Sequence, residues 1–332
     1  MIKKTKSLPQ KAGKLGRKRW IILSTILGLI IVLGLVFSNP MLQPQAKIPL
    51  TALIVDQLAA DFPDPSFVSS VTSTLESHGF NVTYCNGTLD VNFFESLATS
   101  DYGLIILREH SALRNDSSTV DLFTSEPYAP GVYDQDLENG LLALGEYYSK
   151  PDEQYFVLSS LFIEDLPGRF PNSIVIAMGC QSLKPGCEQM AQAFLDKGAK
   201  AYIGWSDVIF PQDTDTETER LVQMLLDENQ TIGDAVRGTR TYTYSGTSSP
   251  YSNEIIHVTT EMRFYPQSVD SLTMSELIAK AKAVSNFGMF ASFDVFLECL
   301  VAGPSKSSRL QQTNFSFSRP EWLSQNDSLR NG

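Results

Sequence analysis

Two residues that could form a nucleophile pair follow apolar runs in this sequence. Cys180 lies three residues after the run IVIA at 174–177, and His110 lies three residues after the run YGLIIL at 102–107. Short continuous apolar runs are typical of strands that are covered on both faces of a parallel sheet. Catalytic groups in such sheets gather at the carboxyl ends of the strands. If the two strands are neighbours, the imidazole can raise the thiolate fraction of the thiol.

The elements around these residues predict an α/β fold. Apolar residues recur at helical spacing from Met190 to Leu195, and Gly198 suits the left-handed turn that ends many helices. The run AKAYIGW at 199–205 then predicts another buried strand. Near the start of the domain, a strand TALIVD, a helix beginning near Pro65 and a strand FNVTY give a βαβ opening. We therefore expect a mostly parallel central sheet.

Three segments together resemble the caspase-like fold shared by caspases, gingipains, legumain, separase and CHAT domains. They are LIILREHS, IVIAMGCQS and MAQAFLDKGAKAYIGWSD, and the similarity covers roughly residues 50–210. In that group one hydrophobic strand ends in the catalytic His and a later strand ends in the catalytic Cys, which a helix and another strand follow. The resemblance implies a three-layer sandwich and a cysteine peptidase that needs no cofactor or metal. It also implies that Cys180 is the nucleophile and His110 the group that protonates the leaving amine.

Two positions depart from the family pattern. The family usually has Gly after the His, where this chain has Ser111, and many members have a larger or acidic residue before the Cys, where this chain has Gly179. Ser111 restricts the backbone more than Gly, but its N–H can still donate to an oxyanion. We expect the backbone at Ser111 and Gly179 to form the oxyanion site.

Asp207 is the candidate for substrate selection. It follows the strand at 199–205, and in relatives that cleave after Arg or Lys an acidic group lines the pocket for that side chain, because a buried cation needs a paired anion. The resemblance thus implies cleavage after Arg or Lys. The alternative is that Asp207 only caps the turn that follows.

Charge is distributed unevenly along the 332 residues. Residues 1–19 carry eight of the 26 basic residues and no acidic residue, which leaves 18 basic against 37 acidic residues and a balance of −19 in the remainder. So acidic a domain argues against nucleic acid as a partner.

Residues 20–37 contain no charged residue and are long enough to cross a bilayer as a helix. Their basic flank at 1–19 predicts a cytoplasmic amino terminus and a domain outside the cytoplasm, anchored in the cell membrane. A cleaved signal peptide has the same layout, but its apolar stretch is shorter, and no small-residue cleavage site follows here. We expect a signal anchor and, at 38–48, a linker.

The rest of the chain is predicted to comprise the α/β domain at 49–266, a helical segment at 267–303 and a polar tail at 304–332. Residues 111–135 form either an overhang that selects substrate or a β-hairpin over the sheet edge, and residues 137–149 predict a helix. The apolar stretch 284–303 contains Asp294 and Glu298, which favour a packed or interfacial helix over a second span.

The four cysteines bear directly on the nucleophile. Cys85, Cys180, Cys187 and Cys299 would lie where disulfides persist, and a Cys180–Cys187 bond would abolish the pair with His110. No C-x-x-C pair supports a zinc site. Six N-x-S/T sequons fit an outward, glycosylated surface, at Asn81, Asn86, Asn115, Asn229, Asn314 and Asn326.

Other strand-end and strand residues have weaker chemical interpretations. Asp56 resembles a response-regulator phosphoacceptor, but the later landmarks of that family are missing, so we expect a polar loop residue. His257 is expected to be a half-exposed strand residue. The sequence thus predicts a membrane-anchored cysteine endopeptidase that acts on peptides. The alternatives are an inactive binding or scaffolding domain of the same fold, and a surface glycoprotein in which Cys180 and His110 meet fortuitously.

Overall fold

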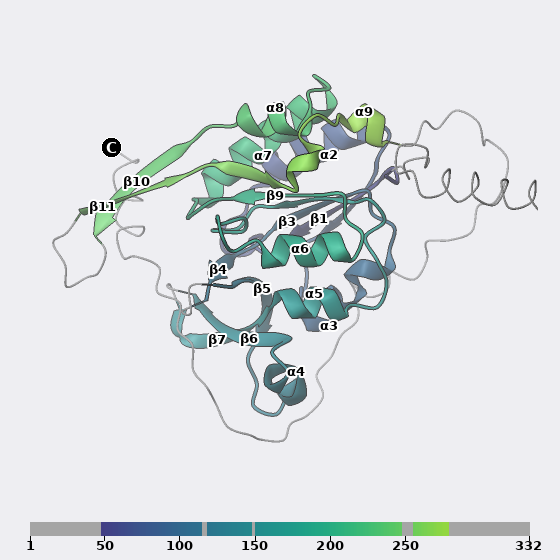
Figure 1. Ribbon diagram of the computed structural model, residues 1–332. Helices are drawn as coiled ribbons and strands as arrows, with labels where there is room; N and C mark the ends of the chain where they lie inside the picture. The colour runs from purple at the N-terminus through teal and green to yellow at the C-terminus, as the bar shows by residue number, and fades with distance from the viewer. Residues whose placement is uncertain (1–47, 115–117, 148–149, 248–254, 279–332) are drawn as a thin grey trace, which may run out of the picture. The chain divides into compact units, whose positions relative to one another are not determined.

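The computed structural model describes residues 48–114, 118–147, 150–247 and 255–278 (Figure 1). Its centre is a six-stranded sheet with the order β12-β9-β8-β3-β1-β2. All neighbouring strands in it are parallel except β12, which runs antiparallel to β9 at one edge. In chain order the strands are β1 (Thr51–Asp56), β2 (Asn81–Cys85), β3 (Leu104–Arg108), β8 (Ile174–Ala177), β9 (Ala201–Trp205) and β12 (Met262–Tyr265). The prediction of an α/β fold with a mostly parallel central sheet is confirmed.

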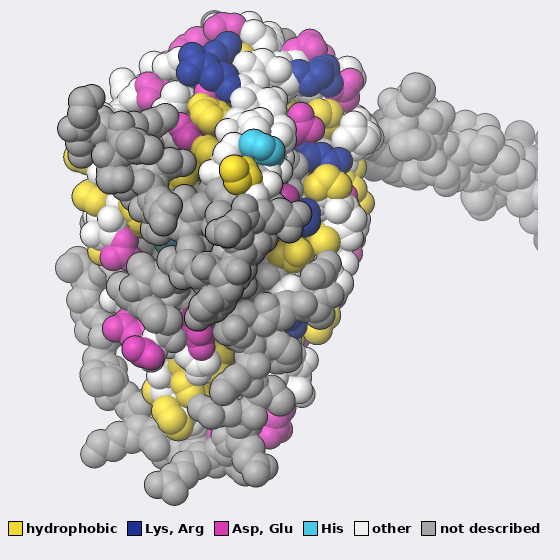
Figure 2. Space-filling view, turned by 90° about the vertical axis from the view of Figure 1, so that its left-hand side faces the viewer, with side chains coloured by type: hydrophobic (Ala, Val, Ile, Leu, Met, Phe, Trp, Pro, Cys, Tyr) yellow, Lys and Arg dark blue, Asp and Glu magenta, His cyan; other side chains and the backbone are white. Residues whose placement is uncertain are grey.

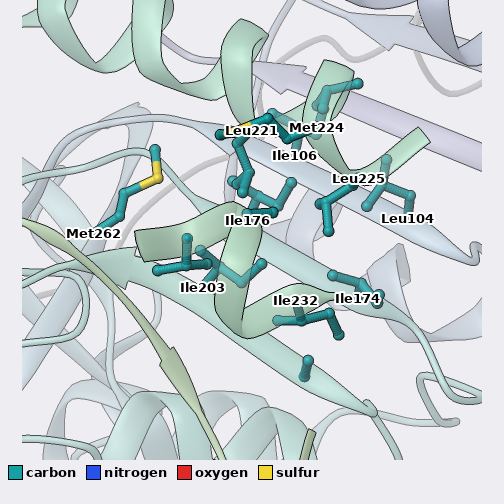
Figure 3. Close-up of a cluster of buried hydrophobic side chains, with 14 of the residues drawn as sticks. Leu104, Ile106, Ile174, Ile176, Ile203, Leu221, Met224, Leu225, Ile232 and Met262 are labelled. Carbon is teal, nitrogen blue, oxygen red and sulfur yellow. The ribbon is translucent and has the colours of Figure 1, made fainter. Parts of the chain in front are cut away.

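One face of this sheet is covered by helices that bury aliphatic side chains. Figure 3 shows Ile106, Ile176 and Ile203 of three adjacent strands together with Leu221 and Leu225 of the helix above them. Such continuous burial is why these strands have uninterrupted apolar sequences. The helices on this face are α2 (Pro65–Ser77), α7 (Pro211–Leu226), α8 (Ile232–Arg237) and α9 (Met274–Leu277), with the short turn η2 (Gln267–Val269) beside them.

The opposite face packs on a second hydrophobic cluster. Alternate residues of the same strands, such as Ile105 and Val175, point to this side and meet Phe162 and Phe194 of two helices. The elements here are α3 (Val91–Ser96), η1 (Leu97–Thr99), α5 (Ser160–Asp165) and α6 (Gln189–Asp196). Helices therefore cover both faces of the central sheet.

A second sheet lies beyond the helices of that face (Figure 1). Its four strands have the order β4-β5-β7-β6 and pair antiparallel. Their bounds are β4 (Ser111–Leu113), β5 (Val120–Pro127), β6 (Leu142–Tyr147) and β7 (Lys150–Leu158), and the helix α4 (Asp134–Glu138) precedes β6. Residues 111–135 thus contain the β-hairpin that was one of the two alternatives.

The helix expected at 137–149 is wrong. α4 ends at Glu138, and residues 142–147 form β6, which pairs with β7 from Leu142↔Leu158 onward. The apolar spacing of LLALGEYY fits a helix, but pairing with β7 and contact with the core decide the structure. Tertiary contacts commonly override local propensity in this way.

A two-stranded antiparallel arm consists of β10 (Tyr242–Thr247) and β11 (Ile255–Thr260). It projects from the body beside the central sheet (Figure 1). Its root is held by aromatic contacts, because the Tyr244 ring packs on Phe210 with 4.6 Å between centroids. His257 lies in β11 with an exposed side chain and bonds Ser245 at 2.7 Å, as expected of a strand residue.

The described ends of the domain meet beside β1. Ile48 is fully buried, forms a parallel bridge with Ile278 and donates its N–H to Leu277 at 2.7 Å. Ile48 is therefore part of the folded domain and not of the linker expected at 38–48. Nearby, α9 begins with a capping box formed by Thr273 and Glu276.

Several predicted segments lie outside the described residues. They are the basic tail 1–19, the expected membrane helix 20–37, the linker up to residue 47, the stretch 284–303 and the tail 304–332. Among the described helices, none is both long enough and apolar enough to cross a membrane.

Candidate functional site: a thiol and an imidazole at adjacent strand ends

The strands that precede Cys180 and His110 are direct neighbours. β3 and β8 pair in parallel, and the last residues that pair are Leu107 and Ala177. Cys180 and His110 each follow these partners by three residues, so the two loops leave the same edge of the sheet at the same level. The two strands are thus parallel neighbours, which is the condition under which the thiol and the imidazole could meet.

The two loops are joined by a direct hydrogen bond. The Ser111 hydroxyl donates to the carbonyl oxygen of Cys180 at 2.7 Å. The loops are so close that a Cβ at Gly179 would overlap Ser111 Oγ and lie 2.8 Å from both the Ser111 nitrogen and the Glu109 oxygen. Glycine at 179 is therefore a steric requirement of this contact. The two residues expected to form the oxyanion site, Ser111 and Gly179, therefore lie at the contact between the histidine loop and the cysteine loop.

The Cys180 side chain is half-buried and contacts the backbone of the loop after β9. Its Sγ lies 3.5 Å from the Ile209 nitrogen, which can donate to it, and 3.4 Å from the Ile209 carbonyl oxygen. An N–H donor favours the thiolate, whereas the carbonyl accepts only from the neutral thiol. The structure shows no disulfide between Cys180 and Cys187, so that alternative is wrong.

Gln181 links the thiol loop to two other loops. Its amide oxygen accepts from the Leu113 N–H at 3.1 Å, its side-chain nitrogen donates to Asp207 at 3.2 Å, and its own N–H donates to the Asp207 carbonyl at 3.0 Å. These bonds hold Gln181 at φ 59°, in the left-handed region that non-glycine residues rarely adopt. Sequence reasoning missed this residue.

His110 lies among aromatic side chains and beside a glutamine. The imidazole centroid is 4.9 Å from the Tyr147 ring, 6.1 Å from Phe62 and 6.3 Å from Phe123. Its backbone N–H donates to Gln57 Oε1 at 3.0 Å, and Gln57 Nε2 donates to the Tyr147 hydroxyl at 2.6 Å. Two residues of the loop after β1, one of β5 and one of β6 thus surround the histidine.

Asp207 lies beside Cys180 on the next loop, but its carboxylate already has partners. Lys184 Nζ lies 2.8 Å from Oδ2, and the Val208 N–H donates to Oδ1 at 2.9 Å. The Val208 bond is the turn-capping contact of the alternative interpretation. A basic substrate side chain would have to compete with Lys184 for this anion.

A buried ion network lies on the other face of β3. Arg108 is fully buried and bonds Asp215 of α7 twice at 2.8 Å and Asp56 of β1 at 2.6 Å. It also donates to the Phe62 carbonyl oxygen at 2.7 Å. Asp56 lies at a strand end, as expected, but it is the last residue of β1 and is buried, so it is not a loop residue. The network fixes the loop that carries Phe62 against the imidazole.

Glu109 is the most isolated carboxyl group in the described part of the chain. It is 1% exposed, and neither oxygen has a hydrogen-bond partner there; the Tyr202 hydroxyl is likewise buried without one. Burial raises the pKa of Glu109 well above its ordinary value. Burial therefore favours the neutral acid over the carboxylate at this position, next to the histidine in sequence.

The missed residues differ in how visible they are in the sequence. Gln57 directly follows the predicted strand at 51–56, so the rule that selected His110 could have selected it as well. Tyr147 could not be found in this way, because its segment was predicted to be a helix. Phe123 could not be found either. It belongs to the β4–β5 hairpin, and no local sequence pattern indicates where that hairpin lies relative to the edge of the central sheet.

Side chains of mixed character occupy the described surface on the side where β4 and the arm lie. Figure 2 shows hydrophobic, acidic and basic groups interspersed there, with no single large apolar patch among the described residues.

The sequon residues Asn81, Asn86 and Asn229 are exposed, which leaves them accessible to modification. Asn115, Asn314 and Asn326 lie outside the described ranges. Within those ranges, no group of three His, Cys, Asp or Glu side chains could hold a metal ion.

Comparisons with known proteins add no assignment to this geometry. A scan against protein-family models finds no match to the chain, and a search of curated proteins finds none either.

Proposed function

We propose that the folded domain is a caspase-like cysteine endopeptidase, with the three-layer arrangement of that fold. Cys180 attacks a peptide carbonyl and forms a thioester, while His110 gives a proton to the departing amine. Water then hydrolyses the thioester with His110 as the base and releases the acid product. The reaction needs no cofactor.

One observation carries this proposal. The two strands are adjacent and parallel, and both candidate residues follow the paired positions Leu107 and Ala177 by three residues. The Ser111–Cys180 hydrogen bond joins their loops. The order along the chain also supports the resemblance, because the histidine strand precedes the cysteine strand, and α6 and β9 follow.

The surroundings of the sulfur fit a nucleophile. The Ile209 N–H can stabilise a thiolate, and the half-buried position leaves Cys180 open to a substrate, unlike the buried Cys85 and Cys187. In the proposed reaction the backbone N–H groups at Ser111 and Gly179 stabilise the oxyanion that forms on the carbonyl oxygen.

Under the same proposal, Asp207 selects Arg or Lys before the scissile bond. Its position beside Cys180 supports this role, and its pairing with Lys184 sets the condition that the substrate cation displaces the lysine. Charge-assisted pairs with a carboxylate favour Arg through its bidentate geometry.

We further propose that residues 20–37 anchor the domain in the cell membrane with residues 47–332 outside. The exposed sequons Asn81, Asn86 and Asn229 support an outward surface. Protease added to intact cells should remove the domain, and glycosidase treatment should lower its mass where a glycosylating host produces it. Full protection from the protease would overturn this topology.

Thiol labelling tests the catalytic proposal. Iodoacetamide should label wild-type Cys180 at pH 6, where an ordinary thiol with a pKa near ~8.5 is slow, and a peptidyl probe should label it as well. Cys180→Ala should abolish this labelling, and His110→Ala should slow it about 100-fold. Cys187→Ala is the matched control and should label as the wild type does.

The labelling experiment also distinguishes the proposed enzyme from the main alternative, an inactive binding or scaffolding domain. An intact fold with slow, ordinary alkylation of Cys180 and no peptide cleavage would overturn the enzyme and favour a binding or scaffolding domain. Labelling that survives in Cys180→Ala would mean that another cysteine is the reactive one.

A further inference from the structure

Tyr147 contacts the ring of His110, the histidine of the proposed mechanism, and is linked to the His110 backbone through Gln57. Its ring lies 4.9 Å from the imidazole centroid with an interplanar angle of 51°. Its hydroxyl accepts from Gln57 Nε2 at 2.6 Å, and the other side of the same amide accepts the His110 N–H at 3.0 Å. Tyr147 therefore contacts the His110 imidazole directly and is connected to the His110 backbone through the Gln57 side chain.

Tyr147 is itself held rigidly. It is 8% exposed, it stacks on Phe123 at 4.9 Å with an interplanar angle of 29°, and its ring lies 4.5 Å from Tyr155. Its hydroxyl also donates to the Thr124 carbonyl oxygen at 3.3 Å. A side chain with this many partners can hold a neighbour within a narrow range of orientations.

The Gln57 amide has a defined orientation for the same reason. Its oxygen faces a backbone donor, and its nitrogen faces the Tyr147 oxygen, so a flipped amide would lose both bonds. Gln57 directly follows β1, the central-sheet strand on the other side of β3 from β8. The histidine loop is thus fixed between the thiol loop on one side and Gln57 on the other.

We propose that Tyr147 and Gln57 are positioning residues for His110 and together act as the third group that orients the base in the thiol–imidazole pair. The inference rests on the proposed function. Tyr147 orients the ring by packing on it, and Gln57 fixes the backbone from which the ring extends. Aromatic contact also favours the charged imidazolium that a Cys⁻/His⁺ pair requires.

The titratable groups near this arrangement are few. Glu109 precedes His110 and is buried, Asp61 lies on the loop that carries Phe62, and Tyr155 of β7 stacks on Tyr147; all three act on Tyr147 electrostatically. Burial, as the largest cause, raises the pKa of Tyr147 far above its ordinary value, so its hydroxyl stays neutral over the working range. Cys180 is the group on the facing loop. Tyr147 itself therefore adds no titration to the pH profiles of the wild type and the Tyr147 variants.

The test is the pH dependence of Cys180 alkylation by iodoacetamide in the full chain with Cys85 and Cys187 intact. Tyr147→Leu should move the acid midpoint of the rate profile upward by about one pH unit and slow alkylation at pH 6 about tenfold. Tyr147→Phe keeps the ring and should restore most of the profile. Gln57→Met should shift it in the same direction as Tyr147→Leu.

Tyr155→Leu is the matched control, because it removes a ring from the same stack without touching the imidazole in the described structure. It should leave the midpoint unchanged even if it lowers thermal stability. NMR provides a second measurement: the Cε1–H resonance of His110, followed as a function of pH, reports the protonation of the imidazole in each variant.

The outcomes separate the two proposals. If wild-type Cys180 shows no low-pH alkylation, the proposed enzyme fails. If the wild type shows it and a folded Tyr147→Leu variant keeps the wild-type midpoint, the positioning role alone is overturned. An equal shift in Tyr155→Leu would also overturn it, since loosening of the stack would then be sufficient.

Discussion

Ser111 Oγ donates to the Cys180 carbonyl oxygen at 2.7 Å, and the same hydroxyl occupies the space that a side chain at residue 179 would need. Ser111 and Gly179 are therefore sterically complementary. The Ser111 hydroxyl fits between the two loops because the residue before Cys180 is a glycine.

This relationship predicts a non-additive pair of substitutions. Gly179→Ala should lower the free energy of unfolding by about 1–3 kcal/mol, because the new methyl group overlaps Ser111 Oγ. Ser111→Gly in the same chain should recover part of that loss, although the Ser111 nitrogen and the Glu109 oxygen remain close. Urea denaturation of the two single variants and the double variant measures the coupling. Simple additivity would contradict the prediction.

Arg108 provides a prediction about stability. Arg108→Met leaves Asp56 and Asp215 buried without their cation, and this should cost about 3–5 kcal/mol of unfolding free energy. Arg237→Met is the control, because that arginine is exposed and should change stability little. Chemical denaturation at neutral pH compares them. Equal effects would mean that the buried network contributes no more than a surface pair.

Glu109 predicts a pH dependence with a definite sign. Burial raises its pKa above the value of 4.5, so between that pH and the folded-state pKa the folded protein holds a proton that the unfolded chain has released. Stability should therefore fall as pH rises through this window, by up to about 1.4 kcal/mol per pH unit. Glu109→Gln should remove this slope and be the more stable form at pH 7.

Thermal unfolding at several pH values between 4 and 8 measures the effect. Glu76→Gln changes an exposed glutamate of α2 and should keep the wild-type slope. A Glu109→Gln variant with the same slope as the wild type would show that another group causes it.

Lys184 and Asp207 predict opposite changes in specificity. Asp207→Asn should lower cleavage after Arg or Lys about tenfold relative to a matched apolar substrate, because the pocket loses its anion. Lys184→Met frees the carboxylate from its partner at 2.8 Å and should raise the same ratio. Lys200→Met, at the amino end of β9, is the control. Fluorogenic peptides that differ only before the scissile bond measure kcat/KM, and an unchanged ratio in both variants would exclude Asp207 from the pocket.

The sheet could be predicted because its strands are encoded locally. Runs such as IVIA at 174–177 are apolar throughout since both faces are buried, and the ends of these runs located His110 and Cys180. The same local logic failed for β6, whose apolar spacing is compatible with a helix and whose structure depends on pairing with β7.

The finer parts of the site depend on contacts between distant segments. The space at Gly179 is set by Ser111, 68 positions earlier, and Tyr147 reaches His110 from a different sheet. The sequence around Asp56 predicts a loop residue, because no local pattern indicates that Asp56 pairs with Arg108, a residue of another strand. Residue types at strand ends can be predicted from a sequence, but their mutual orientation cannot.

The bridge between Ile48 and Ile278 determines how the domain would carry mechanical load. Ile48 precedes β1, so this bridge lies at the amino end of the sheet, roughly 20 Å of strand away from the edge that carries Cys180. A tether that pulls on the chain before Ile48 would first pull Ile48 out of the core and break its hydrogen bond to Leu277, and would then load β1 lengthwise against its two neighbours. The centre of the sheet would thus resist the pull in shear, while the opposite edge, which carries Cys180, lies away from the point where the force is applied.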